Sequence, residues 1–398
     1  MIAWLCAPAW AAGFEVAQQG AIAGGTAHAG TARVSAESAW FDPAALADDG
    51  GLRVAVGAAA AAVRIDAEGD GWAARSQTPL GTPPHLYASW SGHHLLAGVA
   101  VNTAFAGGVA WAPDGPLRFE IIESAPRFLR VAPFLGAGLG PVRLAAGLHV
   151  DAGSLHVLKA TDHVTEEGTA ELSLRGAGVG ADASLYLQAT DALAVGLSYK
   201  GRTRLPLAGE ADFDVPPAFA PQLPDQGIAA SWRLPDRVAL GVRTELGPGR
   251  LVADLVYTAW SVNDVLAIDL QDPASDDVTQ ANAWRDSLAA RLGGEVDVAV
   301  ATLRAGAAVD GLGGAAVPVE TLGPSSPDGP RVEVTVGAGV APVPALRVDA
   351  FGEVLAVLQR TSTSADAPEA SYRGRALVAG LTVTLAAPPR PPRGPRPL

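Results

Sequence analysis

Residues that could do chemistry are few in this chain, and none falls into a recognised catalytic spacing. The acidic segment 66–71, DAEGDG, resembles the opening of a calcium-binding loop, but Gln77 stands in the twelfth position, where such a loop needs a bidentate Glu. His156, Asp162 and His163 share one segment in which no nucleophile is marked out. Nucleophile elbows, H-E-x-x-H and phosphate-binding loops are absent. We therefore expect no enzyme, no metal and no other cofactor, and interpret the remaining polar residues as candidates for binding.

The composition narrows the class of protein further. Charged residues make up only 17% of the 398 residues and the formal net charge is −13, which argues against a nucleic-acid partner because a phosphate backbone needs a basic surface. Basic charge is carried almost entirely by Arg, with Lys159 and Lys200 the only lysines. Forty-six Gly and 31 Pro indicate many turns. A charged fraction this low, together with so many Gly and Pro residues, is unusual for a soluble α/β enzyme.

The N-terminal segment 1–11, MIAWLCAPAWA, predicts an exported protein. It is apolar and ends in the A-x-A pattern of a signal-peptidase site, although it lacks a positively charged start and could be truncated. A buried apolar N-terminus is the alternative. Cys6, the single cysteine, follows Leu5 where a lipidation signal needs a small residue. Elsewhere no uncharged apolar run of about 18 residues exists, so no transmembrane helix is expected.

From residue 51 onward the dominant pattern is alternation of apolar and polar residues, the period of a strand with two different faces. In the segment 331–340, for example, Val332, Val334 and Val336 alternate with Arg331 and Glu333. The same pattern predicts fourteen strands near 51–64, 84–91, 94–105, 127–139, 142–153, 172–188, 193–205, 236–246, 250–261, 285–297, 299–310, 330–341, 345–358 and 371–385. Most of these strands are long enough to cross a bilayer, since a tilted transmembrane strand needs about 9 to 11 residues.

The connections between these strands alternate in length. Tight turns such as Gly140-Pro141 follow the even-numbered strands, whereas long segments follow the odd-numbered ones without exception, for example 65–83, 106–126, 206–235 and 262–284. This sorting is typical of an outer-membrane barrel with short periplasmic turns and long external loops. A soluble all-β protein is the alternative, but it has no reason to sort its loops. The acid clusters in the long loops are either solvated tips or cation bridges to anionic lipid.

The alternation also predicts which side chains face lipid and which face the lumen. Leu, Val and Ala should point outward, with aromatics near strand ends forming an interfacial girdle: Trp90, Tyr199, Tyr257 and Trp260. The inward set is polar and of mixed charge: Arg130, Arg143, His149, Asp151, Asp182, Arg243, Asp254, Arg291, Glu295, Arg304, Asp310, Asp349 and Glu353. Opposite charges in a confined lumen are expected to pair with one another.

Several motifs in order along the chain carry a resemblance to a known family. They include Gln18-Gln19 and Trp40-Phe41-Asp42-Pro43-Ala44 near the start, Gly196-Leu197-Ser198-Tyr199, the run 254–261 (DLVYTAWS), and Leu303-Arg304-Ala305-Gly306. Together the chain resembles the FadL family of outer-membrane transporters for long-chain fatty acids and, in other members, toluene-like hydrocarbons. The resemblance runs from about residue 13 to 385. It implies an all-β, fourteen-stranded antiparallel transmembrane β-barrel with an N-terminal plug, or hatch, inside the lumen.

The resemblance also divides the chain and implies a mechanism. It assigns 1–11 to the signal peptide, 12–50 to the hatch, 51–385 to the barrel and 386–398 to a Pro/Arg-rich periplasmic tail of unknown role. Ligand would be captured by external loops and released sideways into the membrane through a gap at a kinked third strand, near Asn102, Gly107 and Gly108. The hatch would move to open this path, with its gate formed by Phe14, Trp40, Phe41, Asp42, Pro43 and Ala44. The family usually has Asn in place of Asp42, and we ask whether this extra charge pairs with a lumen arginine.

A carrier of fatty acids should present a basic side chain at the outer end of an apolar pocket. The candidates are Lys159, His149, His156 and Arg130, with the apolar side chains Trp111, Phe119, Ile121, Ile122, Phe128, Leu155 and Leu158 lining the path. For an uncharged hydrocarbon Lys159 would be dispensable. The expected partners are a hydrophobic small molecule and outer-membrane lipid, for a monomer in the outer membrane of a Gram-negative-type bacterium. A general porin and, less favoured, a membrane-embedded lipid enzyme remain as alternatives.

Overall fold

The computed structural model describes residues 13–47, 50–163, 166–272, 277–365 and 367–387. The predicted signal peptide and nearly all of the Pro/Arg-rich tail lie outside the described residues. Three short helical segments precede the sheet: α1 (Ala21–Gly24), α2 (Ser38–Phe41) and the 3₁₀ turn η1 (Pro43–Leu46). No helix in the described ranges is both long enough and apolar enough to cross a membrane.

All strands belong to one antiparallel sheet. The first half of the chain supplies β1 (Gly51–Gly69), β2 (Trp72–Arg75), β3 (Pro84–Gly92), β4 (Leu95–Ala106), β5 (Val109–Ala110), β6 (Glu123–Leu139), β7 (Val142–Asp162), β8 (Glu167–Gln188), β9 (Leu193–Lys200) and β10 (Thr203–Asp214). The second half supplies β11 (Gln226–Leu234), β12 (Arg237–Leu246), β13 (Gly249–Thr258), β14 (Val265–Leu270), β15 (Val278–Ala281), β16 (Ser287–Val298), β17 (Ala301–Asp310), β18 (Arg331–Val343), β19 (Leu346–Thr361) and β20 (Ala370–Ala386), with the 3₁₀ turn η2 (Trp260–Val262) before β14.

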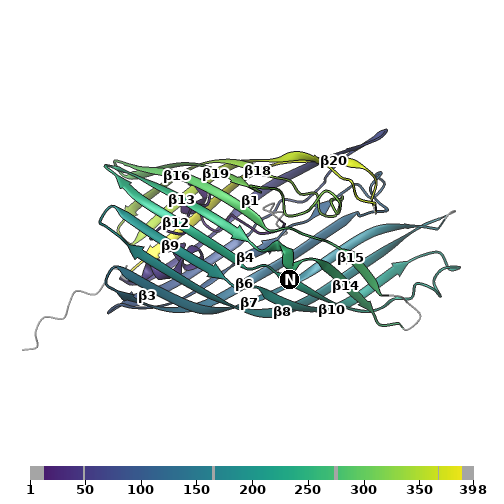
Figure 1. The fold of residues 1–398 in the computed structure, drawn as a ribbon, viewed down its shortest axis with the longest axis horizontal. Helices are drawn as coiled ribbons and strands as arrows, with labels where there is room; N and C mark the ends of the chain where they lie inside the picture. The colour runs from purple at the N-terminus through teal and green to yellow at the C-terminus, as the bar shows by residue number, and fades with distance from the viewer. Residues whose placement is uncertain (1–12, 48–49, 164–165, 273–276, 366, 388–398) are drawn as a thin grey trace, which may run out of the picture.

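These elements form a closed barrel of fourteen crossings, as predicted (Figure 1). Each of the pairs β9–β10, β11–β12, β13–β14 and β15–β16 is one crossing interrupted by a short break, because both members pair with the same neighbouring crossings. The barrel closes where β1 pairs with β20, in a continuous register from Arg53 opposite Ala386 to Gly69 opposite Ala370. Closure leaves no open sheet edge to lipid, which a membrane barrel requires.

The two faces of the wall differ as the alternation predicts. In β18, Val332, Val334 and Val336 are exposed on the outer face, whereas Glu333 and Thr335 are buried in the lumen. The predicted inward charges are buried or half-buried. The prediction of an outward-facing girdle is wrong for Trp260, which is fully buried inside the barrel because η2 turns its ring inward. The other three girdle residues, Trp90, Tyr199 and Tyr257, are exposed.

Several strands extend further than predicted. The segments 206–235 and 262–284, interpreted as loops, contain most of β10, all of β11, and the short strands β14 and β15. Likewise β7 continues to Asp162. In β10 the buried Leu205, Leu207 and Ala211 are apolar and the exposed Arg204, Glu210 and Asp212 are charged, so the pattern of a lipid-facing strand is reversed there.

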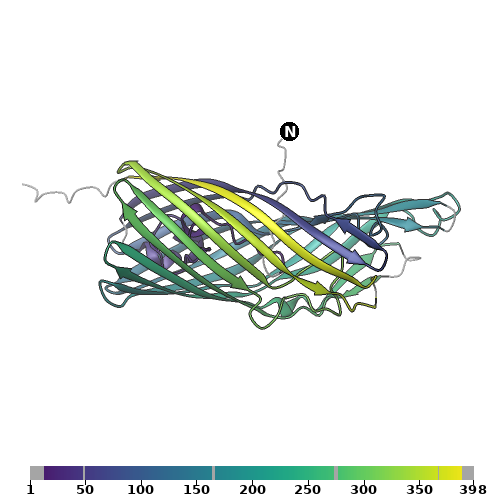
Figure 2. The same ribbon diagram turned by 90° about the horizontal axis from the view of Figure 1, so that it is seen from above.

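The hatch lies inside the barrel near the end that carries the short turns (Figures 1 and 2). Its close fit depends on small residues in the wall. Gly293 and Gly306 face each other across β16 and β17, and a methyl group added to either would approach Thr26 of the hatch within 2.3 or 2.5 Å. Glycine at these two positions therefore makes room for the hatch backbone.

Candidate functional site

The body of the hatch, residues 21–42, is fastened to the wall by polar contacts. Asp254 of β13 accepts hydrogen bonds from the Gly30 and Thr31 amides at 2.9 and 3.0 Å and from the Thr31 hydroxyl at 2.7 Å. Within the hatch, the carboxylate of Glu37 accepts from the Ile22 and Ala23 amides, both at 2.9 Å. A carboxylate that accepts several N–H groups holds a backbone segment firmly because charge-assisted bonds are strong.

Ion pairs add a second set of anchors to the hatch body. Arg33 of the hatch reaches Glu295 of β16 at 2.6 Å, and Glu295 also binds Arg304 of β17 at 3.0 Å. Arg304 in turn contacts Asp349 of β19 at 2.9 Å. These four side chains are nearly fully buried, so the removal of one partner would leave an uncompensated charge in the lumen.

The first described residues of the hatch are held differently, as an extra strand. Glu15 lies opposite Phe105 of β4 in an antiparallel bridge. The Val16 amide donates to the Ala104 carbonyl at 3.0 Å, and the Ala106 amide donates to the Phe14 carbonyl at 2.9 Å. We call residues 14–16 the edge segment.

The edge segment occupies a place where the barrel wall is incomplete. The pairing of β3 with β4 ends at His85 opposite Asn102, because β3 begins at Pro84. The next contact across this seam is the hydrogen bond from the Gln77 amide to the Ala110 carbonyl, at 2.7 Å. Between these two points the β4 residues 104 to 106, which keep β6 as their neighbour on the other side, pair with the edge segment instead of with β3. The hatch thus completes the wall at this seam.

The seam coincides with the irregularity expected in this strand. The pairing of β4 with β6 shifts register between Thr103 and Phe105, and β4 ends at Ala106. Gly108 has a φ of +148°, and a side chain there would collide with the Ser124 carbonyl of β6. Asn102 is fully buried and donates to Gln19 of the hatch at 2.7 Å. The region named in the sequence analysis is therefore where the third crossing departs from regular pairing.

Phe14 of the edge segment lies in a cluster of aromatic rings inside the lumen. Its ring centroid is 4.9 Å from Trp232, 5.1 Å from Trp260, 5.4 Å from Trp284 and 6.4 Å from Phe105, each in an edge-to-face arrangement. Phe128 of β6 extends the cluster, 5.7 Å from Trp232. Edge-to-face packing at these distances is the favoured geometry for aromatic side chains. We call this set the aromatic cluster: Phe14, Phe105, Phe128, Trp232, Trp260 and Trp284.

Of the aromatic cluster, the sequence analysis named only Phe14 and Phe128 as site residues. Trp232 and Trp284 fall in segments interpreted as loops, and Trp260 was placed in the outer girdle. One signal could have indicated them: all three tryptophans stand at breaks in the strand pattern, before Pro235, at η2 and before β16. Because the breaks turn the chain inward, their large rings meet in the lumen.

Two of the predicted basic candidates belong to a separate polar network. Arg130 forms a bidentate pair with Asp151, both bonds being 2.8 Å. His149 contacts Asp182 through Nδ1 and the Thr203 hydroxyl through Nε2, both at 2.9 Å. Both side chains are fully buried and already have partners, so neither presents a free charge to a ligand carboxylate.

The other predicted ligand residues are dispersed over the external part. Lys159 is exposed, on the β7 segment that extends beyond the predicted strand end, and His156 is half-buried beside Glu171 at 3.7 Å. Trp111 is buried with its indole N–H donating to the Pro324 carbonyl, and Phe119 lies under the Arg118 guanidinium. Buried apolar side chains also include Ile121 and Leu155. The structure thus separates Lys159 from Phe128 and the aromatic cluster.

Five of the six predicted gate residues, Trp40 to Ala44, lie near the C-terminal end of the hatch. Trp40 and Phe41 are buried in α2, with the Lys200 ammonium 4.2 Å from the Trp40 ring centre. Asp42 accepts from the Ala44 amide at 3.1 Å and begins η1, where Pro43 takes the first position. No ion pair joins Asp42 to an arginine among the described residues, so the pairing we asked about is not formed. Burial raises the pKa of the Asp42 carboxyl well above its usual range.

Comparison with known proteins places this geometry in a family. The family model described as outer membrane protein transport protein (OMPP1/FadL/TodX) matches residues 132–387. The structure of a Pseudomonas aeruginosa FadL homologue is similar, with a TM-score of 0.86 at 17% identity over 94% of this chain and 100% of that chain.

Two further solved structures share the fold at lower similarity. The Pseudomonas putida toluene transporter TodX has a TM-score of 0.73 at 15% identity, over 93% of this chain and 98% of that chain. The CymD monoaromatic hydrocarbon channel has a TM-score of 0.70 at 17% identity, over 93% and 97%. No curated protein sequence matches. Because the family model covers more than half of the chain, this protein belongs to the OMPP1/FadL/TodX family of outer-membrane transport proteins.

Proposed function

We propose that this protein is a passive, monomeric outer-membrane transporter of hydrophobic small molecules that releases its ligand sideways through the seam between β3 and β4. One observation carries the proposal: the edge segment both completes the wall at the seam and places Phe14 in the aromatic cluster. A ligand that takes the place of the Phe14 ring therefore competes with the same segment that closes the wall.

The steps follow from this coupling. External loops capture the ligand, and the lumen leads it to the aromatic cluster. The ligand displaces the Phe14 ring, and the backbone bonds of Phe14 and Val16 to β4 are lost with it. This frees residues 104 to 106 and opens the seam toward lipid. A ligand shifts the hatch toward the open state only if it binds the open state more tightly than the closed state.

The charges around the cluster favour an uncharged apolar ligand over a fatty acid. Arg237, near Thr258 and the edge segment, is paired with Glu15 at 2.7 Å, and Arg130 is paired with Asp151. A carboxylate entering here would have to break one of these buried pairs, which is costly. Aromatic rings, in contrast, offer edge-to-face contacts to a monoaromatic hydrocarbon. Among proteins of the same fold, TodX is a toluene transporter and CymD is a monoaromatic hydrocarbon channel.

A reversible disulfide between the edge segment and β4 tests the route. Val16 and Ala104 are both fully buried and are joined by the amide-to-carbonyl bond at 3.0 Å. We expect Val16→Cys with Ala104→Cys, in a Cys6→Ser background, to abolish toluene uptake when oxidised and to restore it on reduction. Uptake that persists in the oxidised protein would contradict release through this seam.

A matched control pair lies on the opposite part of the wall. Ala307 and Val334 are register partners on the outer face of β17 and β18. A disulfide there should leave uptake unchanged in both redox states. Oleate, measured in parallel, tests the ligand class, since we expect toluene to be carried at a higher rate than oleate. A general porin would instead pass small ions freely in planar bilayers whether or not the hatch was locked.

A further inference from the structure

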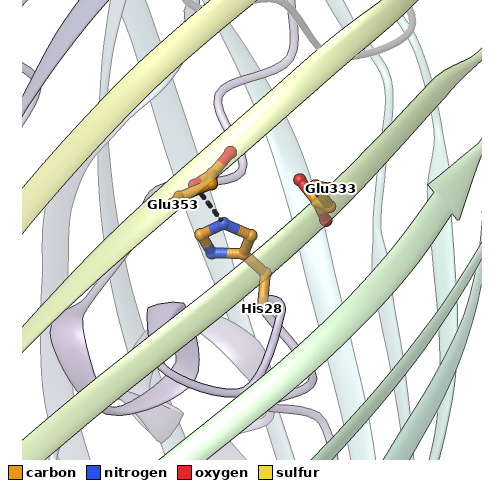
Figure 3. A group of neighbouring side chains, drawn as sticks. All are labelled: His28, Glu333 and Glu353. Atoms are coloured by element: carbon orange, nitrogen blue, oxygen red, sulfur yellow. Dashed lines mark hydrogen bonds and ion pairs between the residues drawn. The ribbon is translucent and has the colours of Figure 1, made fainter.

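A further polar group joins the hatch to the wall, at β18 and β19. His28 of the hatch, Glu333 of β18 and Glu353 of β19 point toward one another (Figure 3). All three are buried, and one possible ligand atom from each lies within 4.8 Å of the other two. The imidazole Nε2 of His28 is 3.0 Å from Glu353.

The backbone holds the imidazole in this position. His28 and the preceding Ala27 both have positive φ values, +62° and +51°, which are uncommon for residues other than glycine. The Ala27 amide donates to the Thr335 hydroxyl at 2.8 Å, and Arg291 donates to the His28 carbonyl at 3.1 Å. A left-handed pair that is fixed on both sides aims the ring at the carboxylates of β18 and β19.

The two carboxylates are brought together by the sheet. Glu353 pairs with Thr335 in the β18–β19 register, so Glu333 is its diagonal neighbour on the lumen face. Gln18 donates to both oxygens of Glu353, at 3.1 and 3.2 Å. Glu333 forms no ion pair with a basic side chain in the part of the chain that the structure describes. Two close carboxylates in a buried lumen need a counter-charge, and the His28 imidazole and the nearby Arg291 guanidinium supply part of it without an ion pair to Glu333 among the described residues.

From this geometry we infer that His28, Glu333 and Glu353 form a binding site for a divalent first-row transition ion, which fastens the hatch to β18 and β19. An imidazole with two carboxylates suits zinc and its neighbours, whereas calcium and magnesium prefer oxygen ligands alone. Zinc bonds of about 2.0–2.2 Å at a tetrahedral centre separate the ligand atoms by roughly 3.3 Å. The observed separations therefore need only small side-chain shifts. No metal was predicted from the sequence, because no histidines and carboxylates in it have a recognised metal-ligand spacing.

Cobalt is the probe, because its visible d–d absorption reports coordination directly. The protein is purified as the full barrel without a histidine tag, in a His93→Asn, His94→Asn background that removes the adjacent histidines of the short turn between β3 and β4. It is stripped with a chelator and then dialysed against Co²⁺. We expect one Co²⁺ per barrel with a d–d band, displaced by Zn²⁺ and not by excess Mg²⁺ or Ca²⁺.

Variants of His28 and Glu353 decide whether these residues bind the metal. Outer-shell changes typically weaken metal binding by about 10–100-fold, so His28→Gln and Glu353→Gln should each weaken it by more than about 100-fold. His85→Gln is the matched control, since this buried histidine of β3 bonds Thr382 and faces no carboxylate in the described structure. Heat-modifiable migration on a gel verifies that each variant is folded.

Two outcomes would overturn the inference. One is Co²⁺ binding that is equal in the reference protein and His28→Gln, which would mean adventitious binding elsewhere. The other is no Co²⁺ binding, with hydrogen exchange of residues 23–31 that depends on pH alone, which would mean that a shared proton neutralises the cluster. Either result leaves the proposed transport route untouched, because that route depends on the edge segment.

Discussion

The edge segment and the hatch body are attached to the barrel by different forces. The body is fixed by buried carboxylates and ion pairs, among them Asp254, Glu295 and Glu37. The edge segment has two backbone bonds to β4, the pair of Glu15 with Arg237, and the packing of one ring. An apolar ligand can replace the Phe14 ring but not a buried ion pair, so on the proposed route the Glu15–Arg237 pair must part together with the two backbone bonds. The edge segment has fewer such attachments than the body, and we expect a hydrophobic ligand to release it while the body stays in place.

The largest expected effect comes from loosening the body. Asp254→Ala removes the acceptor of three hatch donors, and we expect it to weaken the attachment of the body by about 3–5 kcal/mol, since it leaves buried polar groups without partners. Hydrogen exchange of residues 25–33 should accelerate, and ion conductance in planar bilayers should rise. Asp191→Ala, on an exposed turn, is the control. Unchanged exchange would show that the body is not held by Asp254.

Phe14→Ala tests the edge segment separately. Loss of the ring from the aromatic cluster should cost about 3 kcal/mol, the lower end for a buried Phe. We expect faster exchange of the Val16 and Ala106 amides and no change in residues 25–33. The control is Phe119→Ala, which removes a ring from an external loop. If both parts of the hatch loosened together, the two attachments would not be independent.

Asp42→Asn should have a smaller effect on stability, and the size of this effect depends on pH. Burial raises the pKa of Asp42, so the folded protein binds a proton more tightly than the unfolded chain and loses stability as pH rises toward that raised pKa. Asparagine retains an acceptor for the Ala44 amide without the charge. The variant should therefore be more stable than the parent at neutral pH and equal to it in acid. Thermal melting across pH measures this, and a pH-independent difference would refute it.

Lys159→Ala should have the smallest effect. The side chain is exposed and lies outside the aromatic cluster, so stability should change by no more than about 0.5 kcal/mol. Toluene uptake by this variant should be unchanged. Trp232→Ala, which removes a ring of the aromatic cluster, is measured in parallel for comparison. A loss of uptake in Lys159→Ala would move ligand capture to the β7–β8 hairpin and away from the proposed route.

Much of the barrel could be predicted from the chain, whereas the site could not. Alternation located all fourteen crossings and both faces, because a strand between lipid and lumen repeats its environment every two residues. The predicted strand ends at residues 153 and 205 were wrong, because β7 continues to Asp162 and β10 to Asp214. The kinked region near Asn102 and Gly108 was named from glycine and from the family resemblance.

The residues that meet in the lumen were decided only by the tertiary structure. Closure of the sheet brings Trp232, Trp260 and Trp284 around Phe14, and it places His28 against Glu333 and Glu353, although these residues are distant in sequence. The sequence by itself determined a lipid-facing barrel, since its alternation repeats along the chain, whereas the plug was implied by the family resemblance. Contacts across a lumen depend on barrel closure and on the path of the hatch, neither of which leaves a local pattern.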